Sequence, residues 1–182
     1  MSRYAATPIA YNKISGKILG MSFERYLGMG GAGRGMVLGP DEGALIELPG
    51  WHMRIKVSAS DTAGAMTLIE ARMAGGHAGP AEHIHIGHDE AFFVISGQLK
   101  FRVGDGYRTA VSGETVFASR GLAHGFSNPQ PEEARYLVAL TPSGYEFYFE
   151  RLARLIRTHG TMPSQEEIAG LMAEHGTFLA TT

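Results

Sequence analysis

Hydrophobic and polar residues alternate with a period of two through the middle of the chain. Residues 51–57, WHMRIKV, show the alternation clearly. It is typical of a half-buried β-strand, because successive side chains of a strand point to opposite faces. Further strands are predicted at residues 65–73, 89–95, 99–103, 115–118, 124–127 and 135–141, with a tight turn at residues 96–98. Many short strands with Gly-marked turns favour a β-barrel or a β-sandwich.

The period of the pattern changes after Pro142. Apolar residues then fall near helical spacing, at Phe147, Phe149, Leu152, Leu155 and Ile156. A second helix is predicted to start at Ser164, because Glu167 three residues later completes a capping box. Its apolar stripe consists of Ile168, Leu171 and Met172. We expect both helices to pack on the exterior of the barrel or on a second subunit.

Residues 1–35 differ from the rest, being Gly-rich and weakly periodic. Residues 28–33 match G-x-G-x-x-G, but no convincing strand precedes them and no helix can follow before Pro40. They therefore predict a plain loop rather than a dinucleotide site. The expected organisation is an N-terminal extension at 1–42, a barrel at 43–142 and a helical extension at 143–182.

Composition narrows the function classes. The chain has 182 residues, which suits one domain with appendages, and 44% of them are apolar. The formal net charge is −2 and the basic residues are scattered, so nucleic acid is not an expected partner. No apolar run is long enough to span a membrane, and the N-terminus lacks the apolar segment of a secretory signal, which predicts a cytoplasmic location. With no cysteine, any metal must be held by His and carboxylate.

Three histidines and one glutamate form a candidate metal site. His83 and His85 are two residues apart on a predicted strand, so their side chains face the same way. Glu90 shares a strand face with Phe92 and Val94, which places its carboxylate among apolar residues, and His124 comes from a later strand. A carboxylate buried beside three imidazoles is costly by itself, and a divalent ion makes the cluster favourable.

The other histidines are predicted to have no such role. We expect His52, His159 and His175 at the surface and His77 in a loop. His88 lies in the turn between His85 and Glu90, and we expect it to face solvent rather than to act as a fifth ligand.

The spacing of these residues resembles the two cupin motifs. The residues that carry the resemblance are Gly79-Pro80-Ala81-Glu82-His83-Ile84-His85, Glu90, Gly97, Gly113, Gly121, His124 and Asn128. The resemblance covers about residues 43–141 and implies an all-β jelly-roll barrel with the metal ligands His83, His85, Glu90 and His124. The first motif's leading glycine falls at His77 and the second motif's proline at Ser119; neither position is a ligand. The wider layout resembles single-domain quercetin dioxygenase-like cupins.

Four protein ligands leave one or two positions open on an ion that accepts five or six. The first functional hypothesis is a dioxygenase that binds a small enolic or aromatic substrate, with Glu90 as both ligand and general base. The predicted pocket walls are Phe92, Val94, Phe101, Phe117, Phe126 and Tyr136.

Two alternatives remain open. The metal could act as a Lewis acid in an isomerase, lyase or polyketide cyclase, or the barrel could bind a small molecule without catalysis. Imidazole and carboxylate suit Fe, Mn, Ni, Co and Zn. The apolar stripes of the C-terminal helices, together with the tendency of such barrels to pair through sheet edges, predict a homodimer.

Overall fold

The computed structural model describes residues 17–18, 21–22 and 35–180. The chain divides into two compact units, residues 1–35 and 36–182. In the first unit, β1 (Lys17–Ile18) and β2 (Met21–Ser22) form an antiparallel pair. The G-x-G-x-x-G segment at 28–33 lies outside the described residues. The boundaries expected at 42/43 and 142/143 stay predictions.

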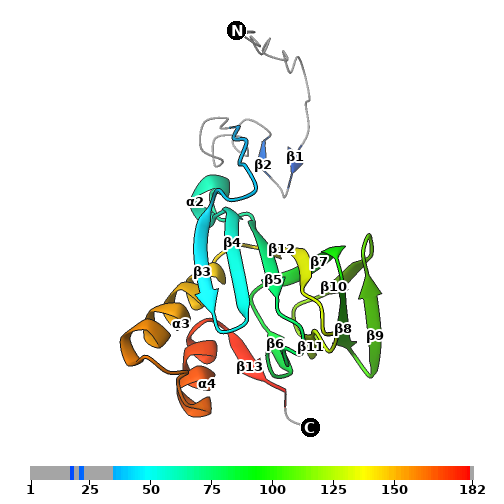
Figure 1. Cartoon of the computed structure of the whole chain (residues 1–182). Helices are drawn as coiled ribbons and strands as arrows, with labels where there is room; N and C mark the ends of the chain where they lie inside the picture. The colour runs from blue at the N-terminus through cyan, green and yellow to red at the C-terminus, as the bar shows by residue number, and fades with distance from the viewer. Residues whose placement is uncertain (1–16, 19–20, 23–34, 181–182) are drawn as a thin grey trace, which may run out of the picture. The chain divides into compact units, whose positions relative to one another are not determined.

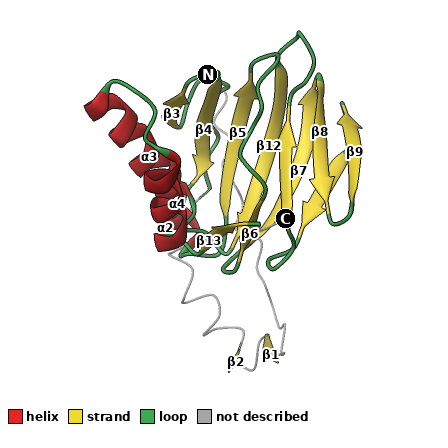
Figure 2. Cartoon of the chain, turned by 90° about the horizontal axis from the view of Figure 1, so that it is seen from below, coloured by secondary structure: helices red, strands yellow, loops and turns green. Residues whose placement is uncertain are grey.

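In the described part of the second unit, the strands form two antiparallel sheets (Figures 1 and 2). The larger sheet has the order β10-β7-β12-β5-β4-β3 and the smaller one β13-β6-β11-β8-β9. The larger sheet contains β3 (Ala44–Leu48), β4 (Trp51–Val57), β5 (Thr67–Met73), β7 (Asp89–Ser96), β10 (Thr115–Ala118) and β12 (Ala134–Thr141). The smaller sheet contains β6 (His83–His85), β8 (Gln98–Val103), β9 (Gly106–Val111), β11 (His124–Ser127) and β13 (Thr177–Leu179). The predicted jelly-roll barrel with two C-terminal helices is confirmed.

The turn at residues 96–98 joins the two sheets rather than forming a hairpin. β7 pairs with β10 and β12, whereas β8 pairs with β9 and β11. Gly97 has a φ of 73°, and a Cβ atom there would lie 2.8 Å from the carbonyl oxygen of Glu133. Glycine is required for both reasons, and the close approach fixes where the chain passes from one sheet to the other.

One core lies between the sheets. Alternate residues of β7 and β12 are buried, as the period-two pattern predicts. The largest fully buried apolar side chains are Tyr136, Phe92, Phe101, Met53, Ile69, Met73, Leu99 and Leu140. The alternation along each strand therefore decides which side chains can face a site inside the barrel.

The helices α3 (Glu146–His159) and α4 (Gln165–Glu174) lie on the side of the barrel formed by β3 and β4 (Figures 1 and 2). Ser164 caps α4 and forms the predicted capping box with Glu167. The helices do not simply coat the exterior: their buried residues join the strands' core, since Leu152 and Met172 belong to it. In the part of the chain that the structure describes, no helix is long and apolar enough to cross a membrane.

A buried carboxylate fixes the start of α3. Glu146 is 1% exposed, and its two oxygens accept hydrogen bonds from the N–H of Ala59, the hydroxyl of Thr67 and the N–H of Gly144, at 2.8, 2.6 and 2.7 Å. Ala59 belongs to the short helix α2 (Ala59–Thr62) and Thr67 to β5. One side chain thus anchors the C-terminal helices to the barrel.

Candidate metal centre

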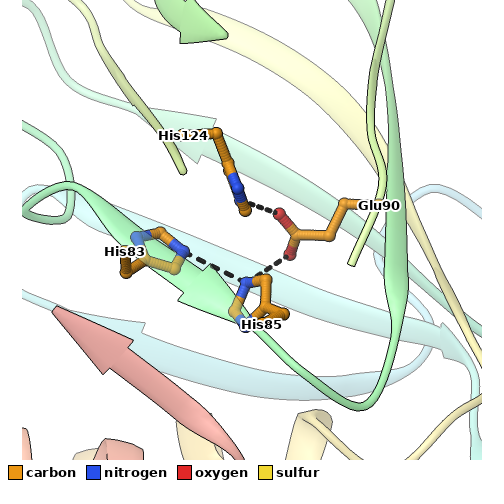
Figure 3. A group of neighbouring side chains, drawn as sticks. All are labelled: His83, His85, Glu90 and His124. Atoms are coloured by element: carbon orange, nitrogen blue, oxygen red, sulfur yellow. Dashed lines mark hydrogen bonds and ion pairs between the residues drawn. The ribbon is translucent and has the colours of Figure 1, made fainter. Parts of the chain in front are cut away.

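Three strands bring the four predicted side chains to one place in the barrel (Figure 3). β6 supplies His83 and His85, β7 supplies Glu90, and β11 supplies His124. His124 lies directly opposite His83 in the register of β11 and β6. One ligand atom of each side chain lies within 4.8 Å of those of the others, and all four side chains are buried.

Each imidazole has an oxygen partner at its outer nitrogen, Nδ1. The partners are the Ala81 carbonyl for His83 at 2.7 Å, the Leu122 carbonyl for His124 at 2.9 Å and the Thr177 hydroxyl for His85 at 2.7 Å. A carbonyl can only accept, so an Nδ1 next to one carries the hydrogen. This leaves Nε2 as the nitrogen that faces the centre of the cluster, which is the arrangement of metal-binding histidines.

The Nε2 atoms and carboxylate oxygens at the centre of the cluster are placed to bind a cation rather than to bind one another. His83 Nε2 and His85 Nε2 are 3.1 Å apart, and Glu90 oxygens lie 2.9 Å from His124 Nε2 and 3.5 Å from His85 Nε2. When the hydrogens of the rings are on Nδ1, the neighbouring Nε2 lone pairs point at each other, and this is unfavourable without a positive charge between them. Imidazole and carboxylate form a donor set for Fe, Mn, Ni, Co or Zn.

The ionisation of the cluster also suits a metal. Burial, with the neighbouring His85 and His124, lowers the pKa of His83 to about 4, so this ring is neutral at pH 7. Burial alone would raise the pKa of Glu90, but hydrogen bonds from His124 and His85 outweigh it and hold that pKa well below its usual range. Burial likewise opposes charge on His124, yet its hydrogen bond to Glu90 raises its pKa. A metal would therefore displace a proton that His124 shares with Glu90.

Several motif residues shape the backbone instead of offering ligands. Gly79 has a φ of 72°, and a Cβ atom there would lie 1.7 Å from the carbonyl oxygen of Phe126. Asn128 is buried, and its Nδ2 donates to the carbonyls of Met73, Ala74 and Glu132. These contacts fix the loops that flank β6 and β11.

His88 is not a solvent-facing turn residue, contrary to the prediction. It is 5% exposed, and its ring centroid lies 4.0 Å from that of His85 and 4.6 Å from that of Tyr145, which also contacts His85. Its Nε2 is 3.9 Å from a Glu90 oxygen and has no hydrogen-bond partner in the described residues. Burial lowers the pKa of His88 to about 4. Local sequence does not reveal this burial, because Tyr145, 57 residues later at the start of α3, covers His88.

The remaining histidines lie away from the cluster. His52 and His159 are exposed, as predicted. His77 lies in a loop, where its ring accepts a hydrogen bond from the N–H of Gly79. His175 was expected at the surface but is half-buried, with its ring 6.1 Å from that of Tyr148, because α4 folds back onto α3.

A cavity of about 350 Å³ adjoins the cluster, and both His83 and Glu90 line it. Three of the predicted walls, Phe92, Phe126 and Tyr136, line it too. Of the other predicted walls, Val94 and Phe101 are buried in the core away from the cavity. Phe117 is 59% exposed, and its prediction as a wall was wrong, because its neighbours Val116 and Ala118 take the inward positions of β10.

The C-terminal helices form one wall of the cavity. The residues that they contribute are Tyr148, Phe149, Leu152, Gln165, Ile168, Ala169 and Met172. The helices pack on the barrel, as expected, and the structure adds that they also line the cavity. The physical reason is that β3 and β4 carry inward apolar residues, Ile46, Leu48 and Met53, which pack with the helices in the same core.

Comparisons with known proteins agree with the geometry. The family model of the cupin domain matches residues 69–140. No curated protein sequence matches the chain. Among solved structures, KdgF from Halomonas sp. is 16% identical with a TM-score of 0.55 and covers 63% of this chain and 99% of its own. The polyketide cyclase RemF from Streptomyces resistomycificus is 18% identical with a TM-score of 0.54, covering 60% and 81%. At such identities the likeness shows the fold alone.

Proposed function

We propose that this protein, whose barrel belongs to the cupin superfamily, is a metal-dependent dioxygenase for a small aromatic substrate with an enol or phenol hydroxyl. The observation that carries the proposal is the contact between the buried cluster and the apolar cavity. His83 and Glu90 belong to both, so a molecule in the cavity lies against the candidate metal ligands.

The candidate ligands and the metal have separate tasks. A divalent transition metal would supply open positions for a substrate oxygen and for dioxygen, and would make the substrate hydroxyl more acidic. Glu90 is the group that takes the hydroxyl proton on its carboxylate oxygen. Burial raises its pKa, but hydrogen bonds from His124 and His85 outweigh burial and hold the pKa well below the usual range, so Glu90 is ionised. A carboxylate with so low a pKa is a weak base, so the transfer depends on the metal making the substrate hydroxyl acidic.

The cavity walls select and orient the substrate. Phe92, Phe126 and Tyr136 present aromatic surfaces that suit a flat ring. The hydroxyl of Tyr136 already accepts a hydrogen bond from Trp51 Nε1 at 2.8 Å, so this polar atom is satisfied within the wall. An apolar ligand would expel water from the cavity, which favours binding and strengthens electrostatic interactions at the cluster.

A second candidate function keeps the metal but does not use oxygen. The same cluster could polarise a carbonyl in an isomerase, lyase or polyketide cyclase. The fold likeness to the cyclase RemF supports it as a competitor, since that barrel accommodates such a reaction. Oxygen consumption separates the two candidates.

The metal centre is tested first, by elemental analysis of protein purified without added metal. We expect about one divalent transition-metal ion per chain in the parent. His83→Ala, His85→Ala and His124→Ala should each lose most of it, because each removes one ligand. His52→Ala, on the exposed face of β4, is the matched control and should keep full occupancy. Full metal content in all three ligand variants would rule out the assigned site.

The reaction is tested with the metal-loaded parent in an oxygen electrode. Aromatic enols and catechols are supplied one at a time, and product is measured with and without oxygen. Oxygen uptake matched to substrate loss supports the dioxygenase. Equal product formation under anaerobic conditions would support the Lewis-acid candidate instead, and binding without turnover of any substrate would support a binding protein.

A further inference from the structure

Thr177 lies on the last described strand, far along the chain from the residues of the cluster. β13 pairs antiparallel with β6, and Thr177 lies opposite His85 in the register. Main-chain hydrogen bonds hold both sides of this pairing, from Ile86 N–H to Gly176 O and from Ala180 N–H to Glu82 O, each 2.9 Å. The Thr177 side chain is therefore fixed beside β6, and the residue is 0% exposed.

The hydroxyl of Thr177 contacts one of the candidate metal ligands. Its Oγ1 lies 2.7 Å from Nδ1 of His85. The same side chain also interacts with the hydroxyl of Tyr145, at the start of α3, and opposes the rise that burial causes in the pKa of Tyr145. A hydroxyl has one hydrogen and can both accept and donate. When Thr177 donates to the Tyr145 oxygen, it is left to accept from His85 Nδ1.

Thr177 thus provides an oxygen partner for Nδ1 of His85, as backbone carbonyls do for Nδ1 of the other two rings. His83 and His124 each find a carbonyl partner two residues earlier in the chain, at Ala81 and Leu122. His85 finds its partner 92 residues later. Ala81 and Leu122 fall inside the segment that matches the cupin domain, residues 69–140, and the partner of His85 falls outside it.

We infer that Thr177 is a positioning residue for the metal centre, and that the C-terminal segment completes that centre. Accepting the Nδ1 hydrogen holds the His85 ring in one orientation, with the Nε2 lone pair toward the ion. The segment that carries Thr177 also forms part of the cavity, through Ile168, Met172 and Leu179. The inference rests on the proposed metal centre but not on any particular reaction.

The test measures metal affinity, because metal binding reports on the ligand geometry without a substrate. Metal-free parent, Thr177→Val and Thr177→Ser are titrated with Zn²⁺ and with Mn²⁺ against a fluorescent chelator. Valine keeps the shape but has no hydroxyl, whereas serine keeps the hydroxyl. Thr109→Val, at an exposed position of β9, is the matched control. Circular dichroism melts of the metal-free proteins show whether each variant is folded.

We expect Thr177→Val to bind both metals about 10- to 100-fold more weakly than the parent, the usual effect of removing such a partner. Thr177→Ser should recover most of the affinity, and Thr109→Val should match the parent. A role in folding alone would lower the melting temperature of metal-free Thr177→Val and leave the metal affinity of its folded fraction unchanged. That outcome overturns the inference.

The two proposals fail in different ways in this experiment. A parent that binds neither metal would overturn the metal centre and with it the inference. A parent that binds metal, together with a folded Thr177→Val of equal affinity, would overturn only the role of Thr177. Tyr145→Phe adds an independent check, because it removes the hydroxyl that interacts with Thr177, and we expect it to weaken metal binding too.

Discussion

At the scale of single residues, the cluster buries a charged carboxylate, and this is unfavourable unless hydrogen bonds or a cation compensate for the lost water. Glu90 is buried, but His124 and His85 hold its pKa well below the usual range. His83 stays neutral because burial and its neighbours lower its pKa to about 4. The result is one ionised carboxylate that shares a proton with His124, and a divalent cation can take the place of that proton.

Glu90→Gln separates a ligand from a general base. Glutamine keeps the size and an oxygen but lacks the charge and the basicity. If Glu90 takes the substrate proton, turnover per bound metal should fall by roughly a hundredfold or more. The measurement is the initial rate divided by the metal content of the same sample. Glu47→Gln, exposed on β3, is the control. Unchanged turnover per metal would leave Glu90 as a ligand only.

At the scale of elements, the C-terminal helices depend on a few tertiary contacts. Their sequence carries helical periodicity and a capping box, but the position of α3 is set by Glu146, whose carboxylate joins α2, β5 and the turn before α3. The cavity and the partner of His85 both follow from that position, because α4 and β13 come next in the chain.

Glu146→Gln should therefore destabilise the fold. An amide offers one acceptor oxygen where the carboxylate accepts three hydrogen bonds, so we expect the free energy of unfolding to fall by roughly 2–4 kcal/mol at pH 7. Urea denaturation followed by circular dichroism measures it. Glu166→Gln, exposed on α4, should stay within about 0.5 kcal/mol of the parent. Equal losses in the two variants would mean that burial of Glu146 carries no special weight.

The same carboxylate predicts a pH dependence of stability. Hydrogen bonds outweigh burial and lower the folded-state pKa of Glu146 from 4.5. The unfolded chain therefore takes up the proton first, so this stabilisation is present above pH 4.5 and is lost as the pH falls below it. The difference in stability between the parent and Glu146→Gln should shrink between pH 5 and pH 3, measured by urea denaturation at each pH. A constant difference would contradict the assignment.

The wall formed by α4 predicts a change in ligand binding without a change in metal content. Ile168 lines the cavity and is half-buried, so Ile168→Trp should occupy part of its volume. We expect the affinity for an apolar naphthalene dye, measured by fluorescence titration, to fall about tenfold, equal to about 1.4 kcal/mol. Val111→Trp, exposed on β9, should bind the dye as the parent does. Equal dye affinity in Ile168→Trp would place the ligand elsewhere.

At the scale of the whole molecule, we propose a homodimer that pairs through the outer face of the larger sheet. Phe93 and Phe117 are exposed there, and the registers of β7 with β10 and β12 place Ala91 and Leu137 beside them. A cluster of exposed apolar side chains beside a sheet edge is a typical pairing surface. Light scattering at micromolar concentration should show twice 19.6 kDa for the parent and 19.6 kDa for Phe117→Asp. A parent that is monomeric would contradict the proposal.

Local patterns in the sequence determined most of the strands, the two helices and the identity of the four clustered side chains, but they did not predict β3, β9 or β13. Alternation fixes which residues of a strand face inward. His83 and His85 of β6 therefore face the same way, and Glu90 of β7 faces the core. Ser164 and Glu167 fixed the start of α4, since a capping box is a local interaction.

Only the tertiary structure decided the features that depend on distant parts of the chain. The turn at Gly97 joins two sheets because Glu133 approaches it, and nothing in residues 96–98 reveals that contact. His88 is buried because Tyr145 covers it, and His85 is oriented by Thr177, 92 residues away. A local pattern reports how one segment is solvated, whereas these contacts depend on which segments the fold brings together.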